Sequence, residues 1–376
     1  MKGFKNAKVY LHGKGIVNCS VAVENGRIAA IGDNLPISEE YAFKGVVLPG
    51  FIDRHVHGAG GADGMDGSAE SLSVISKNLI KEGTTSFCVT TMTQSEENIV
   101  KALNAVKEFK SDYARVLGVH LEGPFISEKY KGAQPEEYIK KPDKRLMERF
   151  LAASGNKIKI VSLAAEQENA KELITFLRQK GVAVSVGHST AKFEEVKKAV
   201  EWGASSITHT YNAQTPLHHR EAGVVGAALL IDELYCELIC DLVHVCKEAV
   251  AVLVKNKPKD KVILITDSMR AKHLPDGESE LGGQKVFVKD GQARLADGTL
   301  AGSVLKMNEA IKNIVEKVGV DFCTAVDYAT VNPAKSLNLF DEIGSISVGK
   351  RADFALLDDN FNVNATIING EVVYKV

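Results

Sequence analysis

The middle of the chain alternates short apolar runs with longer stretches in which apolar residues recur at helical spacing. This alternation is typical of βα units, in which parallel strands are buried on both faces and each is followed by a helix. Eight runs occur, the number of strands that closes a (β/α)8 barrel: residues 46–55, 84–92, 115–122, 157–165, 182–187, 205–209, 236–243 and 261–267. We therefore predict an α/β fold built on a (β/α)8 TIM barrel.

The helical stretches carry their own boundary signals. Three of them, "SAESLSVISKNLIKEG", "SEENIVKALNAVKEF" and "TAKFEEVKKAVEWG", open with Ser or Thr, and two end in Gly. A doubly wound open sheet is the competing fold, but it carries a glycine-rich GxGxxG turn after its first strand. The segment "HGAGGADGMDG" does not match that turn, which favours the barrel.

Both ends of the chain read as β-structure. Alternating runs flank Asn25-Gly26 near the amino end and Asn369-Gly370 near the carboxyl end, and Asn-Gly favours two-residue hairpin turns. We predict that the two ends pair in one small β-sandwich domain, residues 1–48 with 343–376, into which the barrel of residues 49–342 is inserted.

Composition excludes several classes of partner. Of 376 residues, 45% are hydrophobic, and the net charge of −2 provides no basic field for nucleic acid or a membrane surface. The six cysteines are scattered, mostly within apolar segments, as buried free thiols are. Met1 to Lys14 is charged and lacks the apolar core of a signal peptide. We expect a protein of the reducing cytoplasm.

The candidate chemistry lies where the predicted strands end, and in a barrel these carboxyl ends meet at one face. Residues i and i+2 of a strand point the same way, so His55 and His57 can converge on one ion. Imidazole and carboxylate ligands suit Zn²⁺, Fe²⁺, Mn²⁺ or Co²⁺. The histidines and acids at these ends predict a hydrolytic metal site: His55, His57, His120, Glu122, His188, His209, His244 and Asp267.

Structural alternatives exist for each of these residues taken alone. A single histidine at a strand end is more often hydrogen-bonded in the core than bound to metal. We interpret His120, inside "GVHLEG", as a structural or supporting residue. Asp267 is the candidate proton shuttle beside a metal-bound water, and its alternative is a cap on the following loop. The coincidence of all these residues at one predicted face favours the metal site.

The motifs "PGFIDRHVHG", "HLEGPFIS", "KGAQP", "VGHSTA", "THTYNAQTPLHHRE", "LITDSMRAKHLPDGE" and "DGTLAGS" follow one another in this order. Together with "VNPAKSLNL" and "GSISVGKRADFALLD" they resemble the N-acetylglucosamine-6-phosphate deacetylase family of the amidohydrolase superfamily. His-x-His is common to the superfamily, whereas "HLEGPF", "YNA" and "HHRE" are specific to this branch. The resemblance implies hydrolysis of N-acetylglucosamine-6-phosphate to glucosamine-6-phosphate and acetate in amino-sugar catabolism, by a homodimer.

The resemblance also implies roles for individual residues. Glu122, His188 and His209 would bind the principal metal, and Asp267 would be the catalytic acid and base. His55 and His57 would allow a second ion, so that one or two divalent ions are expected, zinc first, with iron, cobalt or manganese as alternatives. No lysine ends the fourth strand to carry the carbamate bridge of other amidohydrolases, so Glu122 could bridge two ions.

Substrate contacts follow from the same matching. Asn212, Ala213 and Arg220 would bind the phosphate, and His219 could reach it in its own or a neighbouring subunit. His244 would bind the sugar. The remaining contacts implied by the family lie in two loops: Ala133, Gln134, Leu300, Ala301 and Gly302.

The chain departs from the family pattern beside the phosphate site, where Thr210, Gln214 and Ala222 replace more usual residues. These departures bear on the substrate, so N-acetylgalactosamine-6-phosphate is an alternative to its epimer. Another amidohydrolase acting on a phosphorylated amide is a second alternative. An inactive scaffold is a third, and it would lack ligands or the acid and base, all of which are present here.

Overall fold

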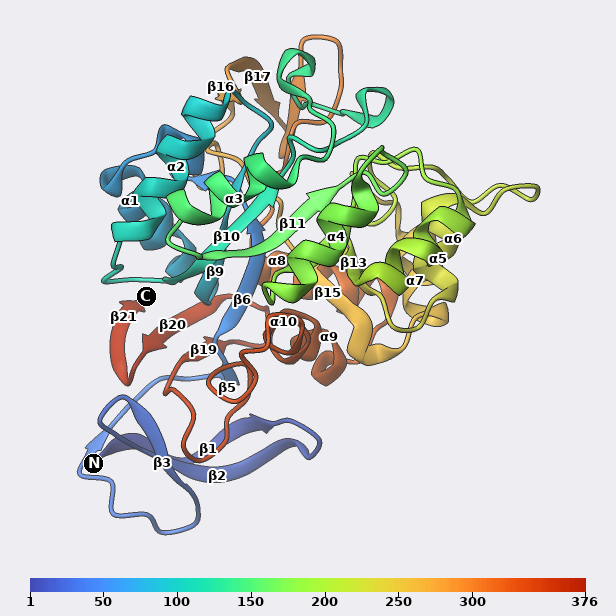
Figure 1. The fold of residues 1–376 in the computed structure, drawn as a ribbon. Coiled ribbons are helices and arrows are strands. Elements are labelled where there is room, and N and C mark those ends of the chain that lie inside the picture. The colour runs from blue at the N-terminus through green and yellow to red at the C-terminus, as the bar shows by residue number, and fades with distance from the viewer.

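The computed structural model describes residues 1–376, and its centre is an eight-stranded parallel sheet surrounded by helices (Figure 1). Beyond the last strand, Asp267 N–H donates to the His55 carbonyl at 2.9 Å, and His57 N–H donates to the Ser268 carbonyl at 2.9 Å. These bonds join the first and last strands, which confirms the predicted barrel. Its strands are β6 (Phe51–Val56), β9 (Thr84–Thr91), β10 (Arg115–Glu122), β11 (Ile158–Leu163), β12 (Ala183–Val186), β13 (Ala204–Ile207), β14 (Tyr235–Ile239) and β15 (Val262–Ile265).

The helices cover the outside of the barrel and enclose the larger hydrophobic core with it. The predicted caps hold at α1 and α2, where Ser68 and Ser95 accept bonds from Ser71 N–H and Asn98 N–H. The third expected cap is wrong. The helix α5 begins after Lys192, and the hydroxyl of Thr190 donates to Glu166 instead. The helices are α1 (Ala69–Leu79), α2 (Glu96–Glu108), α3 (Lys144–Ala153), α4 (Ala170–Gln179), α5 (Phe193–Trp202), α6 (Gly223–Leu230), α7 (Lys247–Asn256), α8 (Met307–Asn313), α9 (Phe322–Ala329) and α10 (Val331–Ser336).

The two ends of the chain meet in a second eight-stranded sheet, as predicted. Both expected hairpin turns are present, with positive φ at Asn25, Gly26, Asn369 and Gly370. This sheet encloses a separate core of 14 buried residues, and we propose on that ground the division into 1–48 with 343–376 and 49–342. Its strands are β1 (Lys2–Leu11), β2 (Gly15–Glu24), β3 (Arg27–Gly32), β4 (Glu39–Glu40), β5 (Val46–Pro49), β19 (Phe354–Leu357), β20 (Val363–Ile368) and β21 (Glu371–Lys375).

The apolar run 46–55 is not one strand, which corrects the prediction. It divides at Gly50, where a Cβ atom would lie 2.2 Å from the hydroxyl of Thr85. The first half, β5, pairs with β19 of the terminal sheet, and the second half, β6, pairs with β9 of the barrel. The run is buried along almost its whole length because it passes from one core directly into another.

A three-stranded antiparallel sheet follows the last barrel strand and was not predicted. It consists of β16 (Gly277–Leu281), β17 (Gln284–Lys289) and β18 (Gln292–Leu295). Figure 1 shows it beside the loops that follow β10. Ala301 N–H donates to the Ala293 carbonyl at 3.0 Å, which ties this sheet to the segment beside Asp267. A two-stranded sheet, β7 (Gly58–Ala59) with β8 (Ala62–Asp63), follows β6.

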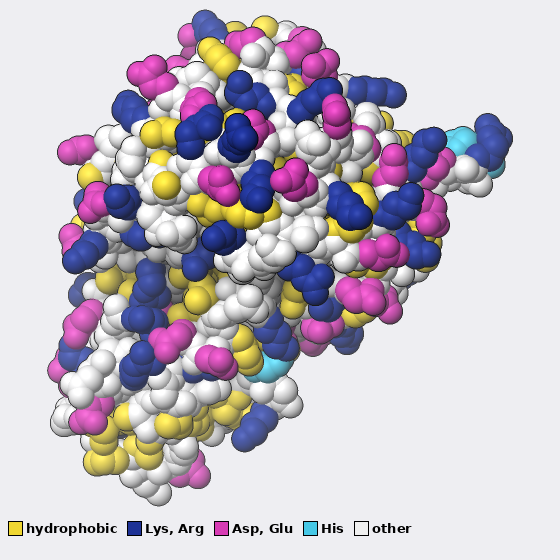
Figure 2. Space-filling view, viewed as in Figure 1, with side chains coloured by type: hydrophobic (Ala, Val, Ile, Leu, Met, Phe, Trp, Pro, Cys, Tyr) yellow, Lys and Arg dark blue, Asp and Glu magenta, His cyan; other side chains and the backbone are white.

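The helices of the structure are short, and none combines the length and the apolar character needed to cross a membrane. All six cysteines are free thiols. On the face shown in Figure 2, acidic and basic side chains are interspersed.

Candidate active site and metal centre

The predicted ligands converge at the carboxyl ends of the barrel strands. Glu122 is the last residue of β10, and His188, His209 and Asp267 each lie two residues beyond a strand. These three have φ values of 48°, 30° and 49°, in the left-handed region. Such a backbone costs on the order of 1–3 kcal/mol per non-glycine residue and persists where the surrounding structure enforces it. The strained turns aim the side chains across the barrel mouth.

Glu122, His188 and His209 form the first of two ligand groups, here called the Glu122 trio. Glu122 Oε1 lies 3.2 Å from His188 Nε2 and 3.1 Å from His209 Nε2, and the two nitrogens are 3.0 Å apart. Tetrahedral ligands about 2.0–2.1 Å from a zinc ion would be about 3.3 Å from one another. His188 Nδ1 donates to the Tyr130 carbonyl at 2.8 Å, so in neutral imidazole Nε2 carries the free lone pair.

His55, His57 and Asp267 form the second group, the Asp267 trio. Asp267 Oδ1 lies 3.3 Å from His55 Nε2 and 3.2 Å from His57 Nε2. Glu122 faces this group as well, because its Oε2 is 3.2 Å from His57 Nε2. The two trios are therefore adjacent, and the Glu122 carboxylate would be available to an ion in either of them.

The electrostatics of the two trios call for positive charge. His55 Nε2 is buried without a hydrogen-bond partner, and its neighbours Glu122 and Asp267 offer only acceptor oxygens when ionised. Burial lowers the pKa of His57, but Asp267 and Glu122 more than offset it and raise that pKa to about 9. Burial raises the pKa values of Glu122 and Asp267, yet His55 and the other histidines bring both below their usual range. Divalent cations would satisfy the facing lone pairs and carboxylates, so the donor set fits metal.

A cleft of about 350 Å³ opens over the trios. It is lined by most of the predicted substrate contacts, with Ala301 buried just behind it. Gln134 also contacts the ligands directly, since its amide donates to Glu122 Oε2 at 2.9 Å. The predicted residues that line the cleft are Ala133, Gln134, Asn212, Ala213, His244, Leu300 and Gly302.

His244 is held by a carboxylate that the sequence analysis did not identify. Its Nδ1 donates to Asp241 Oδ2 at 2.6 Å, and its backbone N–H donates to Asp241 Oδ1 at 2.9 Å. Burial raises the pKa of Asp241, but His244 brings it below its usual value. This pairing leaves His244 Nε2 free on the cleft side. The Asp-x-x-His spacing of "DLVH" was the available signal.

Arg220 and His219 are not brought to the cleft of their own chain. They lie in an exposed loop, residues 216–221, closed by a bridge between His218 and Glu221. The yellow-green loop projects from the body in Figure 1, and Figure 2 shows histidine and Lys or Arg side chains at its end. Arg220 Nη1 contacts His219 Nε2 at 2.7 Å. Lys129 is the only lysine or arginine that lines the cleft, and sequence patterns gave no reason to select it.

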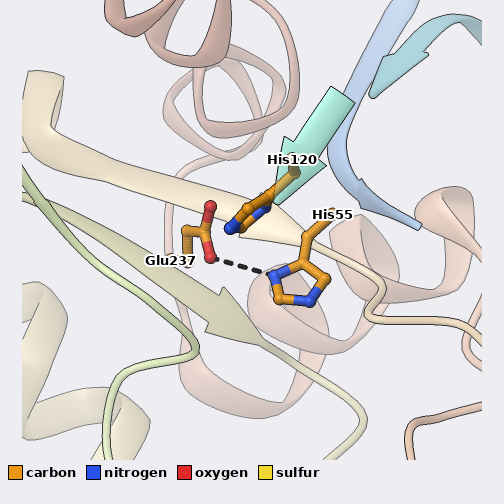
Figure 3. Close-up of side chains that lie close together, drawn as sticks. All are labelled: His55, His120 and Glu237. Atoms are coloured by element: carbon orange, nitrogen blue, oxygen red, sulfur yellow. Dashed lines mark hydrogen bonds and ion pairs between the residues drawn. The ribbon is translucent and has the colours of Figure 1, made fainter. Parts of the chain in front are cut away.

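A buried layer beneath the ligands was also missed. Glu237 of β14 contacts His55, as Figure 3 shows, and it also contacts Arg54. All three side chains are fully buried. His120 hydrogen-bonds the Arg54 carbonyl and Ser162 Oγ, and burial lowers its pKa to about 3. His120 is thus a neutral residue of this layer, in line with its structural interpretation. The signal for Glu237 was an acid inside the apolar run "CELICDLV".

Comparison with known proteins decides the family. The amidohydrolase family model matches residues 46–373. The chain belongs to the amidohydrolase family. Within it, the N-acetylglucosamine-6-phosphate deacetylase of Bacillus subtilis (strain 168) is 41% identical to this amidohydrolase, over 98% of this chain and 96% of that protein.

Other relatives belong to the same branch. The N-acetylgalactosamine-6-phosphate deacetylase of Escherichia coli O157:H7 is 36% identical over 93% of each chain. The crystal structure of N-acetylglucosamine-6-phosphate deacetylase from Pasteurella multocida is 33% identical, covers 99% of each chain and superposes with a TM-score of 0.93. These relatives confirm the resemblance to the deacetylase family, and with it the prediction that the protein is a hydrolase.

Proposed function

We propose that this amidohydrolase removes the acetyl group of N-acetylglucosamine-6-phosphate, releasing acetate and glucosamine-6-phosphate. The observation that carries the proposal is the pair of adjacent trios that both contact the Glu122 carboxylate, with Asp267 among the residues that line the cleft. A relative that is 41% identical over 98% of this chain is named N-acetylglucosamine-6-phosphate deacetylase. We further propose that the preferred metal is zinc, with one ion in the Glu122 trio and a second in the Asp267 trio.

A bound divalent cation would polarise the acetamide carbonyl and lower the pKa of water in the cleft. The residues of the chain supply the proton transfers. Asp267 is ionised, since its pKa lies below the usual value, and it accepts the proton of the attacking water. The same carboxyl then protonates the amine nitrogen as the C–N bond breaks. His244, held by Asp241, presents Nε2 to the sugar.

The phosphate end of the substrate requires donors, because a phosphomonoester is held by guanidinium and backbone N–H groups. We propose that Asn212, Ala213 and Lys129 contribute from the same chain. Arg220 and His219 project away from it, and Leu217 beside them is 55% exposed. We therefore propose a homodimer in which each exposed loop reaches the cleft of the partner. We also place the enzyme in the cytoplasm, since its cysteines are unpaired.

Acetate release from purified enzyme tests the reaction. We expect rapid release from N-acetylglucosamine-6-phosphate, slower release from N-acetylgalactosamine-6-phosphate, and little from unphosphorylated N-acetylglucosamine. A faster reaction with the galacto epimer would support the alternative suggested by the E. coli relative. Absence of acetate from all three sugars would refute the proposal.

Complementation between two inactive variants tests the dimer. Glu122→Gln would disable the metal site, and Arg220→Met would disable the phosphate contact to the partner. In mixed dimers, the cleft of the Arg220→Met chain keeps its ligands and receives Arg220 from the other chain. We expect activity to reappear on mixing and refolding the two variants. If Arg220 acts in its own cleft or not at all, mixing restores nothing.

A further inference from the structure

The side chains beneath the Asp267 trio form a connected set that the proposed reaction does not use. Figure 3 shows Glu237 and His120 on neighbouring sides of His55, with Glu237 directed at the His55 ring. Glu237 Oε2 lies 3.2 Å from His55 Nδ1. Its other oxygen, Oε1, accepts a 2.7 Å bond from Arg54 Nε. None of these three side chains is exposed to solvent.

The contacts of Arg54 fix the orientation of Glu237. Arg54 donates to Ser336 Oγ at 2.8 Å and to Ser206 Oγ at 3.2 Å, in addition to Glu237. An arginine side chain is always charged and cannot accept a hydrogen bond. Its partner in a fully buried site must therefore be an acceptor, which keeps Oε1 on the Arg54 side and leaves Oε2 for His55.

The position of Glu237 determines the tautomer of His55. A carboxylate can only accept, so the proton of a neutral His55 ring lies on Nδ1. The lone pair is then on Nε2, which lies 3.3 Å from Asp267 Oδ1 and has no hydrogen-bond partner. A histidine binds a cation through the nitrogen that carries the lone pair, and a carboxylate on the other nitrogen strengthens that bond.

The same side chains could be considered as a separate metal site, since His55, His120 and Glu237 lie close together. Both ring nitrogens of His120 are already engaged, at 3.1 Å with the Arg54 carbonyl and at 2.7 Å with Ser162 Oγ. Glu237 Oε1 is engaged with Arg54. The one free nitrogen of this group, His55 Nε2, faces the Asp267 trio, so the role of His120 and Glu237 is support.

We propose that Glu237 is a positioning residue that turns His55 into a metal ligand and thereby creates the second ion site. The inference deepens the proposed function and rests on its metal-dependent part. Glu237 also accepts the His209 N–H at 3.4 Å, but it does not contact the His209 ring. Its influence should therefore fall on the ion of the Asp267 trio, with the ion of the Glu122 trio retained.

Glu237→Gln tests this role because glutamine has the same shape but one acceptor and one donor group. The amide oxygen must face buried Arg54, so the amide NH₂ faces His55 Nδ1. His55 is then driven to the tautomer with its proton on Nε2, which cannot bind metal. We expect metal analysis to give two ions per chain for the wild type and one for Glu237→Gln, with His55→Asn giving one as well.

Ser206→Ala is the matched control, because it removes one Arg54 hydrogen bond in the same layer without touching Glu237. We expect this variant to keep two ions. Two ions in Glu237→Gln, or loss of both ions, would overturn the inference. A wild type that binds a single ion would overturn it as well.

A measurement on the wild type covers the case in which Glu237→Gln does not fold. In zinc-loaded protein labelled with ¹⁵N-histidine, NMR should show the His55 proton on Nδ1, with His55→Asn identifying the signal. A proton on Nε2 alone would overturn the inference. Acetate release separates it from the proposed function, because a one-ion enzyme that releases acetate refutes only the second site. A two-ion protein that releases none refutes only the reaction.

Discussion

The two trios contain the same kinds of ligand but are supported in different ways. In the Glu122 trio, His188 and His209 lie beyond strand ends on left-handed backbone, and His188 is fixed by a backbone carbonyl. In the Asp267 trio, His55 and His57 point the same way, two residues apart at the end of β6. The buried carboxylate of Glu237 contacts His55 Nδ1 and orients the His55 ring. His188 is thus oriented by a backbone carbonyl, whereas His55 is oriented by a side-chain carboxylate.

Of the substitutions considered, Glu122→Gln should have the largest effect on metal binding, because the Glu122 carboxylate contacts both trios. We expect both ions to be bound much more weakly, with a loss greater than the roughly 100-fold that follows removal of an outer partner. Metal analysis after dialysis and acetate release measure the two consequences. Glu108→Gln, at an exposed position on α2, should behave as wild type. Retention of both ions by Glu122→Gln would show that the trios do not depend on a shared carboxylate.

Asp267→Asn should reduce turnover by about 10²- to 10⁴-fold, the usual contribution of a general acid and base. The ion of the Glu122 trio should remain, since Asp267 is not part of that group. Steady-state kinetics and metal analysis on the same sample check both parts. Near-wild-type turnover would exclude Asp267 as the proton carrier.

His55→Asn and His188→Asn compare the trios directly. We expect His55→Asn to halve the metal content and to reduce kcat less than Asp267→Asn does, because the Glu122 trio stays intact. His188→Asn should lose the ion of the Glu122 trio and with it nearly all turnover. Equal losses from the two variants would mean that the trios bind metal as a single unit.

Asp241→Asn should have the smallest effect and extends the comparison to His244, which lines the cleft and which we propose binds the sugar. Asp241 holds His244 as Glu237 holds His55, through Nδ1. Loss of this charged hydrogen bond should raise KM about 10-fold, which corresponds to about 1.4 kcal/mol, with metal content unchanged. Asp359→Asn, at an exposed position, is the control. An unchanged KM would mean that His244 is oriented by its backbone alone.

Much of the fold followed from local patterns. The alternation of apolar runs and helical stretches predicted the barrel, and the Asn-Gly turns predicted paired chain ends. The division of the run 46–55 at Gly50 was not predicted, because it depends on the close contact of Gly50 with Thr85 on another strand. The sheet of β16 to β18 was missed, since its residues lie outside the repeating βα pattern.

The sequence by itself determined which side chains stand at the strand ends, because parallel strands in a barrel expose their carboxyl ends at one face. It thus predicted a metal site at this face, with Glu122, His188 and His209 among the candidate ligands. Only the tertiary structure decided which side chains support them. Glu237 lies 182 residues from His55 in the chain, and the register of the strands brings the two together. The tertiary structure also decided that Arg220 lies in a projecting loop, away from the cleft of its own chain. The position of such a loop depends on packing that no local sequence pattern specifies.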